Sequence, residues 1–270
     1  MTISEIFACV DRLFSEKHAE KVEPFLLEQL REAEAGGDLA VTAAVCNELG
    51  GLYRATGRYE EGIPLYQKAL AAIEGLDETG TEGHATTLIN YGTTYAVKGD
   101  VTRGLKIFAE AAKILSALGL DRDYRMATLH NNMSILCQDS GDFDQALLHL
   151  ESALDILKGL SDSEAEIAST YSNMAQVHLR RGRLDDAFRA CNAATGLFEK
   201  ISGDTDVHYS AAVETRGQIK LASGDTEGAL NDFHKALCLI ERDYGSNTPA
   251  AAALRDLIED IRSGMKGGGR

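Results

Sequence analysis

Histidine and cysteine are the side chains of this sequence best suited to metal binding or nucleophilic chemistry, and neither is spaced for it. The seven histidines include no pair three or four residues apart, so no two imidazoles share one helix face as a metal site would need. The five cysteines include no Cys-x-x-Cys pair, and an odd number cannot pair completely into disulfides. We therefore expect reduced, mostly buried thiols, with no metal and no cofactor.

The motifs of other catalytic classes are also missing. The sequence contains no Gly-x-Gly-x-x-Gly, no phosphate-loop lysine, no His-Glu-x-x-His and no Gly-x-Ser-x-Gly. The acidic residues of 139–144 superficially suggest a calcium loop, but they lack the glycine and terminal glutamate at the spacing that such a loop needs. We expect no catalytic residues, and hence a protein that is not an enzyme.

The overall charge argues against nucleic acid and lipid as partners. Lys and Arg number 27 against 42 Asp and Glu, which gives a net charge of -15. This charge repels phosphate backbones and anionic lipid headgroups. The first sixteen residues lack the basic start and long apolar centre of a signal peptide, and no window approaches the roughly 18 apolar residues of a membrane span. These features predict a cytoplasmic protein that binds neither nucleic acid nor membrane.

Glycine marks a repeat along the chain. Gly57, Gly99, Gly141, Gly182 and Gly224 are separated by 42, 42, 41 and 42 residues. Seven positions before each of these turn glycines lies a small residue, namely Gly50, Gly92, Ser134, Ala175 or Gly217. Nine positions after them lie Tyr66, Phe108, Leu150, Cys191 and Phe233, and twelve after them lie Ala69, Ala111, Ala153, Ala194 and Ala236. Small residues let helix axes approach closely and bulky ones fill the space beside them, so each unit is predicted to be a hairpin of two packed helices.

Local signals support the helices and their ends. From Phe143 to Leu157 the apolar residues follow the spacing of one helix face. The dipeptides at 99–100, 141–142 and 224–225 are Gly-Asp, which predicts a left-handed glycine that ends one helix and an aspartate that caps the next. Ser161 and Glu164 fit a capping box, and Thr248 before Pro249 predicts the start of a last helix.

The order of small, turn-glycine, bulky and alanine positions resembles the tetratricopeptide repeat, over residues 41–244. The usual repeat has 34 residues, so this one resembles the longer variant of kinesin light chains and bacterial peptide-responsive regulators. The resemblance implies an all-α fold, a right-handed α-solenoid of helix hairpins. We expect a degenerate N-terminal hairpin at 1–37, five repeats at 38–244, a capping helix at 245–264 and a flexible tail at 265–270.

The resemblance also implies where binding residues lie. In this family the concave wall comes from the first helix of each hairpin, at positions ten, nine, six, three and two before the turn glycine. The predicted peptide-binding groove contains Asn47, Arg54, Asn90, Thr93, Asn131, Asn132, Gln138, Asn173, Gln176, Arg180 and Gln218. Amides nine before the glycine both donate and accept, which suits an extended peptide backbone. The alternative is that they bond neighbouring helices or water.

These observations favour one function and leave others open. The leading hypothesis is an adaptor or scaffold that binds an extended segment of a partner protein or peptide in the groove. The alternatives are a stand-alone peptide-sensing regulator and, from another class, a small-molecule binder or an unrecognised enzyme. The groove columns lack the Lys and Arg of a carboxylate clamp, so a terminal carboxylate is not the expected ligand. Self-association of the chain stays open.

Overall fold

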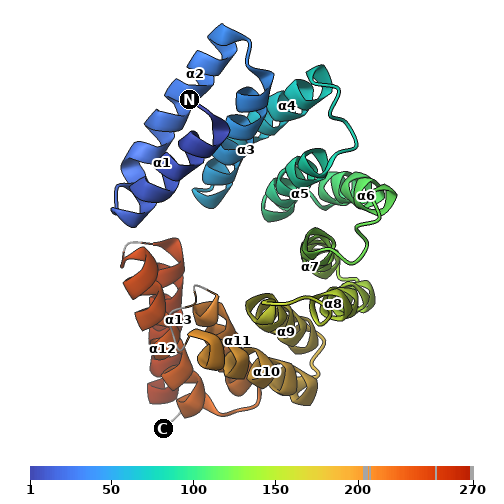
Figure 1. Ribbon diagram of the computed structural model, residues 1–270. Coiled ribbons are helices and arrows are strands. Elements are labelled where there is room, and N and C mark those ends of the chain that lie inside the picture. Colours follow the sequence, from blue (N-terminus) through green and yellow to red (C-terminus); the bar gives the residue numbers. More distant parts are fainter. Residues whose placement is uncertain (203–205, 207, 247, 268–270) are drawn as a thin grey trace. The chain divides into compact units, whose positions relative to one another are not determined.

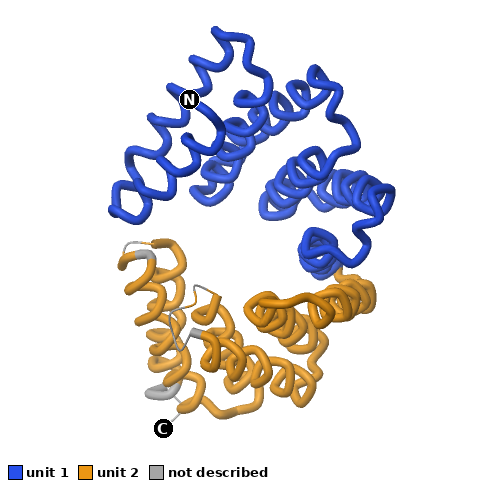
Figure 2. The backbone as a smooth tube through the Cα atoms, in the orientation of Figure 1, with its two compact units in different colours: residues 1–140 blue, residues 141–270 orange. Residues whose placement is uncertain are grey.

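The computed structural model describes residues 1–202, 206, 208–246 and 248–267. Within these ranges the chain is helical and contains no β-strand, which confirms the all-α prediction (Figure 1). It divides into two compact units, Met1–Ser140 and Gly141–Arg270 (Figure 2). Each unit is a stack of helices with its own apolar core.

Unit 1 contains seven α-helices and one short 3-10 helix. They are α1 (Ile3–Ser15), η1 (Ala19–Lys21), α2 (Val22–Gly36), α3 (Leu39–Ala55), α4 (Tyr59–Gly75), α5 (Glu82–Val97), α6 (Val101–Ala117) and α7 (Tyr124–Asp139). The pairs α3 with α4 and α5 with α6 form closely packed hairpins. Residues 1–37, where a degenerate hairpin was expected, form α1, η1 and α2.

Unit 2 continues the pattern with hairpins formed by α9 with α10 and α11 with α12. Its helices are α8 (Phe143–Leu157), α9 (Glu164–Arg180), α10 (Leu184–Ser202), α11 (Tyr209–Ala222), α12 (Thr226–Tyr244) and α13 (Pro249–Gly267). Residues 268–270 of the predicted tail lie outside the described residues, whereas 265–267 belong to α13. Gly264 does not end this helix, because one glycine inside a helix costs only about 1 kcal/mol relative to alanine.

The predicted Gly-Asp helix boundaries are confirmed. Gly99 has φ 83° and Gly224 has φ 89°, both in the left-handed region that glycine adopts without strain. The next residue caps the following helix: Asp100 Oδ1 accepts from the Arg103 N–H at 3.1 Å, and Asp225 Oδ1 from the Gly228 N–H at 2.9 Å. Each boundary therefore satisfies backbone groups at both helix ends.

Small residues permit the close helix crossings, as predicted. A Cβ atom at Gly50 would lie 2.6 Å from the Tyr66 ring, and one at Gly217 would lie 2.7 Å from the Phe233 ring. Both rings are fully buried. The bulky residue of the second helix thus occupies the space that the small residue of the first helix leaves.

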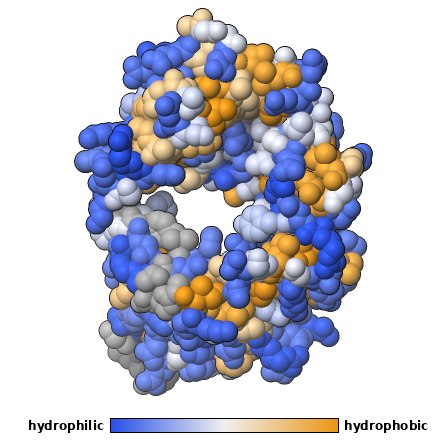
Figure 3. Space-filling model, in the orientation of Figure 1, coloured by the Kyte–Doolittle hydropathy of each residue, from blue (hydrophilic) through white to orange (hydrophobic). Residues whose placement is uncertain are grey.

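The last helix covers the core of unit 2. Thr248 Oγ1 accepts from the Ala251 N–H at 3.2 Å, which confirms the predicted start of α13. Leu254 and Ile258 of α13 join the apolar cluster that contains Phe198 and Phe233. Hydrophilic residues cover much of the visible surface of each unit, and hydrophobic residues appear there in smaller areas (Figure 3).

One predicted cap is wrong. The capping box expected from Ser161 and Glu164 does not form, because α9 starts at Glu164 itself. The N-cap residue is Ser163, and its side chain makes no capping hydrogen bond. Its Oγ instead donates to the backbone oxygens of Leu157 at 2.7 Å and Leu160 at 3.2 Å. Ser163 is buried, so its hydroxyl needs a partner within the protein, which the carbonyls at and just after the end of α8 provide.

Candidate functional site

The predicted binding residues lie on the first helix of each hairpin. We call these positions the first-helix wall of each unit: they lie ten, nine, six, three and two before the turn glycines, on α3, α5 and α7 in unit 1 and on α9 and α11 in unit 2. Most of the predicted side chains on it are half-buried. Partial exposure leaves a side chain both held by its helix and accessible to a ligand.

In unit 1, hydrogen bonds between predicted residues link neighbouring first helices. Asn90 Nδ2 of α5 donates to Asn47 Oδ1 of α3 at 3.2 Å. Asn132 Nδ2 of α7 donates to Thr93 Oγ1 of α5 at 2.9 Å. A primary amide has two N–H donors and an oxygen acceptor. Each of these hydrogen bonds between helices uses only one donor or one acceptor of a given amide. The amides therefore hold the helices together and keep further hydrogen-bonding capacity.

Three other predicted residues of unit 1 have different surroundings. Arg54 Nη1 donates to the Asn90 backbone oxygen at 3.3 Å, so the guanidinium also joins α3 to α5. Asn131 Nδ2 donates within its own helix, to the Ala127 oxygen at 3.4 Å. Gln138 is only 5% exposed, and a ligand on the wall has little access to it.

Unit 2 has a corresponding bond that sequence reasoning missed. Gln176 Nε2 of α9 donates at 3.4 Å to Oγ1 of Thr215, which lies nine positions before its turn glycine on α11, in the same column as Asn90. Gln218 Nε2 donates to Glu214 Oε1 at 3.3 Å. Burial raises the pKa of the Glu214 carboxyl, and this bond partly offsets the effect.

The other two predicted residues of unit 2 are also near its surface. Asn173 is half-buried on α9, and Arg180 is exposed at the end of the same helix. The Arg180 guanidinium carbon lies 5.2 Å from the centre of the Phe143 ring, within the range of a cation–π contact. Arg180 is therefore engaged with α8 rather than extended freely from the wall.

A pocket of about 550 Å³ opens beside the wall of unit 1. It is lined by α1, α3, the end of α4 with the following loop, the start of α5 and Arg125 of α7. Of the predicted residues, Asn47 lines it. Its volume falls within the range of roughly 300–1,000 Å³ that is usual for small-ligand pockets. Sequence reasoning missed this pocket, because α1 forms one side of it.

The Arg125 side chain at the pocket is held by two carboxylates. Arg125 Nε donates to Asp123 Oδ1 at 2.7 Å, and Arg125 Nη1 donates to Glu82 Oε2 at 2.5 Å. The bonds from Arg125 lower the pKa of Asp123, while both carboxylates raise the pKa of Arg125. The guanidinium charge is therefore compensated within the protein.

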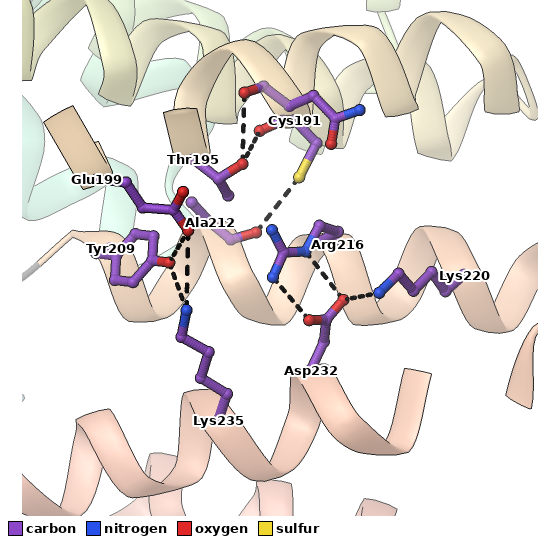
Figure 4. Close-up of polar contacts among 10 residues, drawn as sticks. Cys191, Thr195, Glu199, Tyr209, Ala212, Arg216, Lys220, Asp232 and Lys235 are labelled. Carbon is purple, nitrogen blue, oxygen red and sulfur yellow. Dashed lines mark hydrogen bonds and ion pairs between the residues drawn. The ribbon is translucent and has the colours of Figure 1, made fainter. Parts of the chain in front are cut away.

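A second charged cluster fixes α11 against α12 in unit 2 (Figure 4). Arg216 donates to both oxygens of Asp232, at 3.0 and 2.7 Å, and Lys220 Nζ lies 2.7 Å from Asp232 Oδ2. Asp232 is 5% exposed. Burial opposes ionisation of Asp232, but the hydrogen bonds from Arg216 and Lys220 outweigh it and lower the pKa. This network packs two helices together, which gives it a structural role.

The described residues offer no group of three His, Cys, Asp or Glu side chains that could hold a metal ion. All five cysteines are free thiols in the structure. Burial raises the pKa of Cys46 and of Cys191 to about 11, which keeps both thiols protonated at neutral pH. Among the described helices, none is long and apolar enough to cross a bilayer.

Comparison with known proteins relates the repeat to others of the same type. Protein KINESIN LIGHT CHAIN-RELATED 3 of Arabidopsis thaliana is 21% identical over 238 residues, which cover 88% of this chain and 36% of the relative. This chain thus spans about a third of that plant protein. Among solved structures, BtubC (BKLC) from P. vanneervenii matches with a TM-score of 0.65 and 21% identity over 93% of each chain.

A further structure, NprR in complex with its cognate peptide NprX, matches with a TM-score of 0.74 and 15% identity, over 99% of this chain and 74% of that one. At such identities the two structural matches establish the shared fold. The sequence profile of the tetratricopeptide repeat matches residues 39–96, 83–159 and 166–237, which together make up more than half of the chain. This chain belongs to the tetratricopeptide repeat family, with repeats like those of kinesin light chains.

Proposed function

We propose that this protein is an adaptor or scaffold that binds an extended segment of a partner protein along its first-helix wall. Membership of the tetratricopeptide repeat family supports binding of a protein or peptide. The observation that carries the proposal is the row of half-buried amides in unit 1, where Asn47 bonds Asn90 and Thr93 bonds Asn132. These bonds fix the amides in place before a ligand arrives.

The chemistry of the row suits a peptide backbone. An extended peptide presents N–H donors and carbonyl acceptors in alternation, and a primary amide pairs with both. Because the amides are already positioned by their neighbours, binding a peptide orders fewer side chains and costs less entropy. Amides are neutral, so a bound backbone leaves no buried charge without a partner.

The test uses a displayed library of random twelve-residue peptides, selected against the whole chain. Replacing Asn90 and Asn132 together with alanine should weaken binding of the selected peptides by about 1 to 3 kcal/mol, roughly fivefold to 150-fold, because two hydrogen bonds are lost. Asn231→Ala is the matched control, because Asn231 is exposed on α12, away from the wall. Equal affinities for the wild type and the double variant, with helix content unchanged, would rule out this site.

We also propose a cytoplasmic location. The five free thiols suit a reducing compartment. Cell fractionation with an antibody to the protein tests this, and recovery from a secreted or membrane fraction would contradict it.

A further inference from the structure

The pocket of unit 1 is lined in part by apolar side chains. Ala40, Ala43 and Ala44 of α3 line it, and Ile3 and Phe7 of α1 form an apolar side. Alanine side chains are short, so three of them on one helix face leave room above the helix backbone. The next repeat carries the larger, polar Thr86 at the position that corresponds to Ala44. The α1 side and the alanines of α3 thus give the pocket an apolar part, and its volume of about 550 Å³ has room for a branched aliphatic side chain.

The rim of the same pocket is negatively charged. Glu78 and Glu82 line it, and both are exposed. Arg125, the positively charged side chain that lines the pocket, forms ion pairs with Glu82 and Asp123. An incoming carboxylate would have to displace one of these partners, whereas an incoming ammonium or guanidinium group can meet the exposed Glu78 carboxylate without displacing Arg125.

His84 also lines the pocket, and its Nδ1 accepts from the Gly80 N–H at 3.0 Å, so the ring is held by the preceding loop. Among the lining residues, the two carboxylates of Glu78 and Glu82 stand against the single fixed charge of Arg125. The local charge has the same sign as the net charge of the chain, -15.

We propose that this pocket gives the protein its sequence preference: it binds a peptide segment in which an aliphatic side chain lies next to a lysine or arginine. The proposal rests on the peptide-binding function proposed above and adds the class of peptide. The aliphatic side chain fills the hollow over Ala44, and the cation lies against Glu78 and Glu82. Acidic peptides are disfavoured, because they meet like charge at the rim.

The test compares two peptide libraries on the whole chain. Both contain acetylated, amidated hexapeptides with one fixed leucine; one library has lysine beside it and the other has glutamate. We expect the lysine library to bind about tenfold more tightly, a difference that shrinks in high salt because exposed charges are screened. Equal binding of both libraries, or tighter binding of the glutamate library, overturns the proposal.

Two substitutions assign the effect to the pocket. Ala44→Phe fills the hollow and should weaken the leucine–lysine peptides at least tenfold. Ala211→Phe is its matched control, because Ala211 is the corresponding position of α11 in unit 2, and it should leave their affinity within about twofold of the wild type. Equal losses from both variants, or no loss from Ala44→Phe, overturn the assignment to this pocket.

A third substitution reverses the preference. Glu82→Gln releases one partner of Arg125, so the lysine library should lose affinity and the glutamate library should gain it. A purely structural role of Glu82 would lower both affinities together and would contradict the proposal. If neither library binds the wild type and the random library also yields no binder, the proposed function fails. If random peptides bind without a basic or aliphatic preference, only the present inference fails.

Discussion

Removing the Asp232 carboxylate should destabilise unit 2 more than any change on its surface. Asp232→Ala leaves Arg216 and Lys220 close together with no counter-charge. Breaking a buried ion pair in this way usually costs about 3 to 5 kcal/mol. The Arg216 and Lys220 side chains retain 19% and 26% of their exposure, so water offsets part of this cost. We therefore expect a loss of about 3 kcal/mol.

Urea unfolding followed by circular dichroism at 222 nm measures this loss, and hydrogen exchange of α11 and α12 locates it. The pH dependence has a defined sign. The folded-state pKa of Asp232 lies below its ordinary value of 3.8, so its stabilising effect is complete at pH 7 and fades as the pH falls through the folded-state pKa. The difference between wild type and Asp232→Ala should thus be largest near neutral pH and should shrink below pH 4.

A compensating variant separates lost charge from lost packing. In the preceding repeat, Met174 and Ala190 occupy the positions that correspond to Arg216 and Asp232. The double variant Arg216→Met with Asp232→Ala copies that pair and removes the isolated guanidinium. Replacing a buried ion pair with apolar residues is often neutral or stabilising, so this variant should be more stable than Asp232→Ala alone. A loss below about 1 kcal/mol for Asp232→Ala, with no gain in the double variant, would refute the reasoning.

Three further predictions test packing and burial. Gly50→Ala should destabilise unit 1 by about 1 to 3 kcal/mol in urea unfolding, because its Cβ would lie 2.6 Å from the buried Tyr66 ring. Gly51→Ala is the control, because its Cβ has open space, and it should stabilise unit 1 by up to about 1 kcal/mol. Equal effects of the two substitutions would contradict this packing. Tyr66→Phe should leave the free energy of unfolding unchanged or raise it by about 1 kcal/mol, because Tyr66 Oη is buried with no hydrogen-bond partner among the described residues. A clear loss of stability would contradict this, because it would mean that the hydroxyl has a hydrogen-bond partner. Native-state alkylation with iodoacetamide should label the exposed Cys238 and spare Cys46, because burial raises the pKa of the Cys46 thiol to about 11. Mass spectrometry measures the labelling, and similar rates for the two cysteines would contradict the burial of Cys46.

The hairpin fold follows from the sequence because the same residue types recur at the same positions in successive repeats. Gly50 and Gly217 lie where a neighbouring ring leaves no room for a side chain, and the spacing of such positions alone indicates a helix crossing. Asp100 and Asp225 cap helices through contacts three residues away, which local sequence contains in full. The predicted cap at Ser161 differs, because α9 begins at Glu164 and the hydroxyl of its N-cap residue, Ser163, donates to the end of the preceding helix instead.

The candidate binding surface was predictable only in part. Column positions placed Asn47, Asn90 and Asn132 on first helices, but periodicity does not say which amides bond each other across helices. The pocket escaped prediction since it needs α1, which lies outside the clear repeats, to contribute Ile3 and Phe7. Its charge depends on ion pairs of long side chains, whose conformations a spacing pattern does not determine.

The buried pair of Arg216 and Asp232 did leave a signal in the sequence. The position eight before the turn glycine holds Leu49, Tyr91, Met133 and Met174 in the first four repeats and Arg216 in the fifth. The position eight after it changes in the same repeat to Asp232. Opposite charges that appear together in two otherwise mostly apolar columns indicate a contact between the helices that carry them.

Site-specific photo-crosslinking tests the central claim, that a partner peptide lies on the first-helix wall, most directly. A benzophenone side chain replaces Gly51 on the wall of α3 or, as the control, Gly196 on α10; neither glycine has a neighbouring atom within 4 Å of the added Cβ. After illumination with a selected peptide, mass spectrometry should find the peptide attached at position 51 and not at position 196. Attachment at position 196 alone, or at neither position while the peptide is bound, would contradict the account.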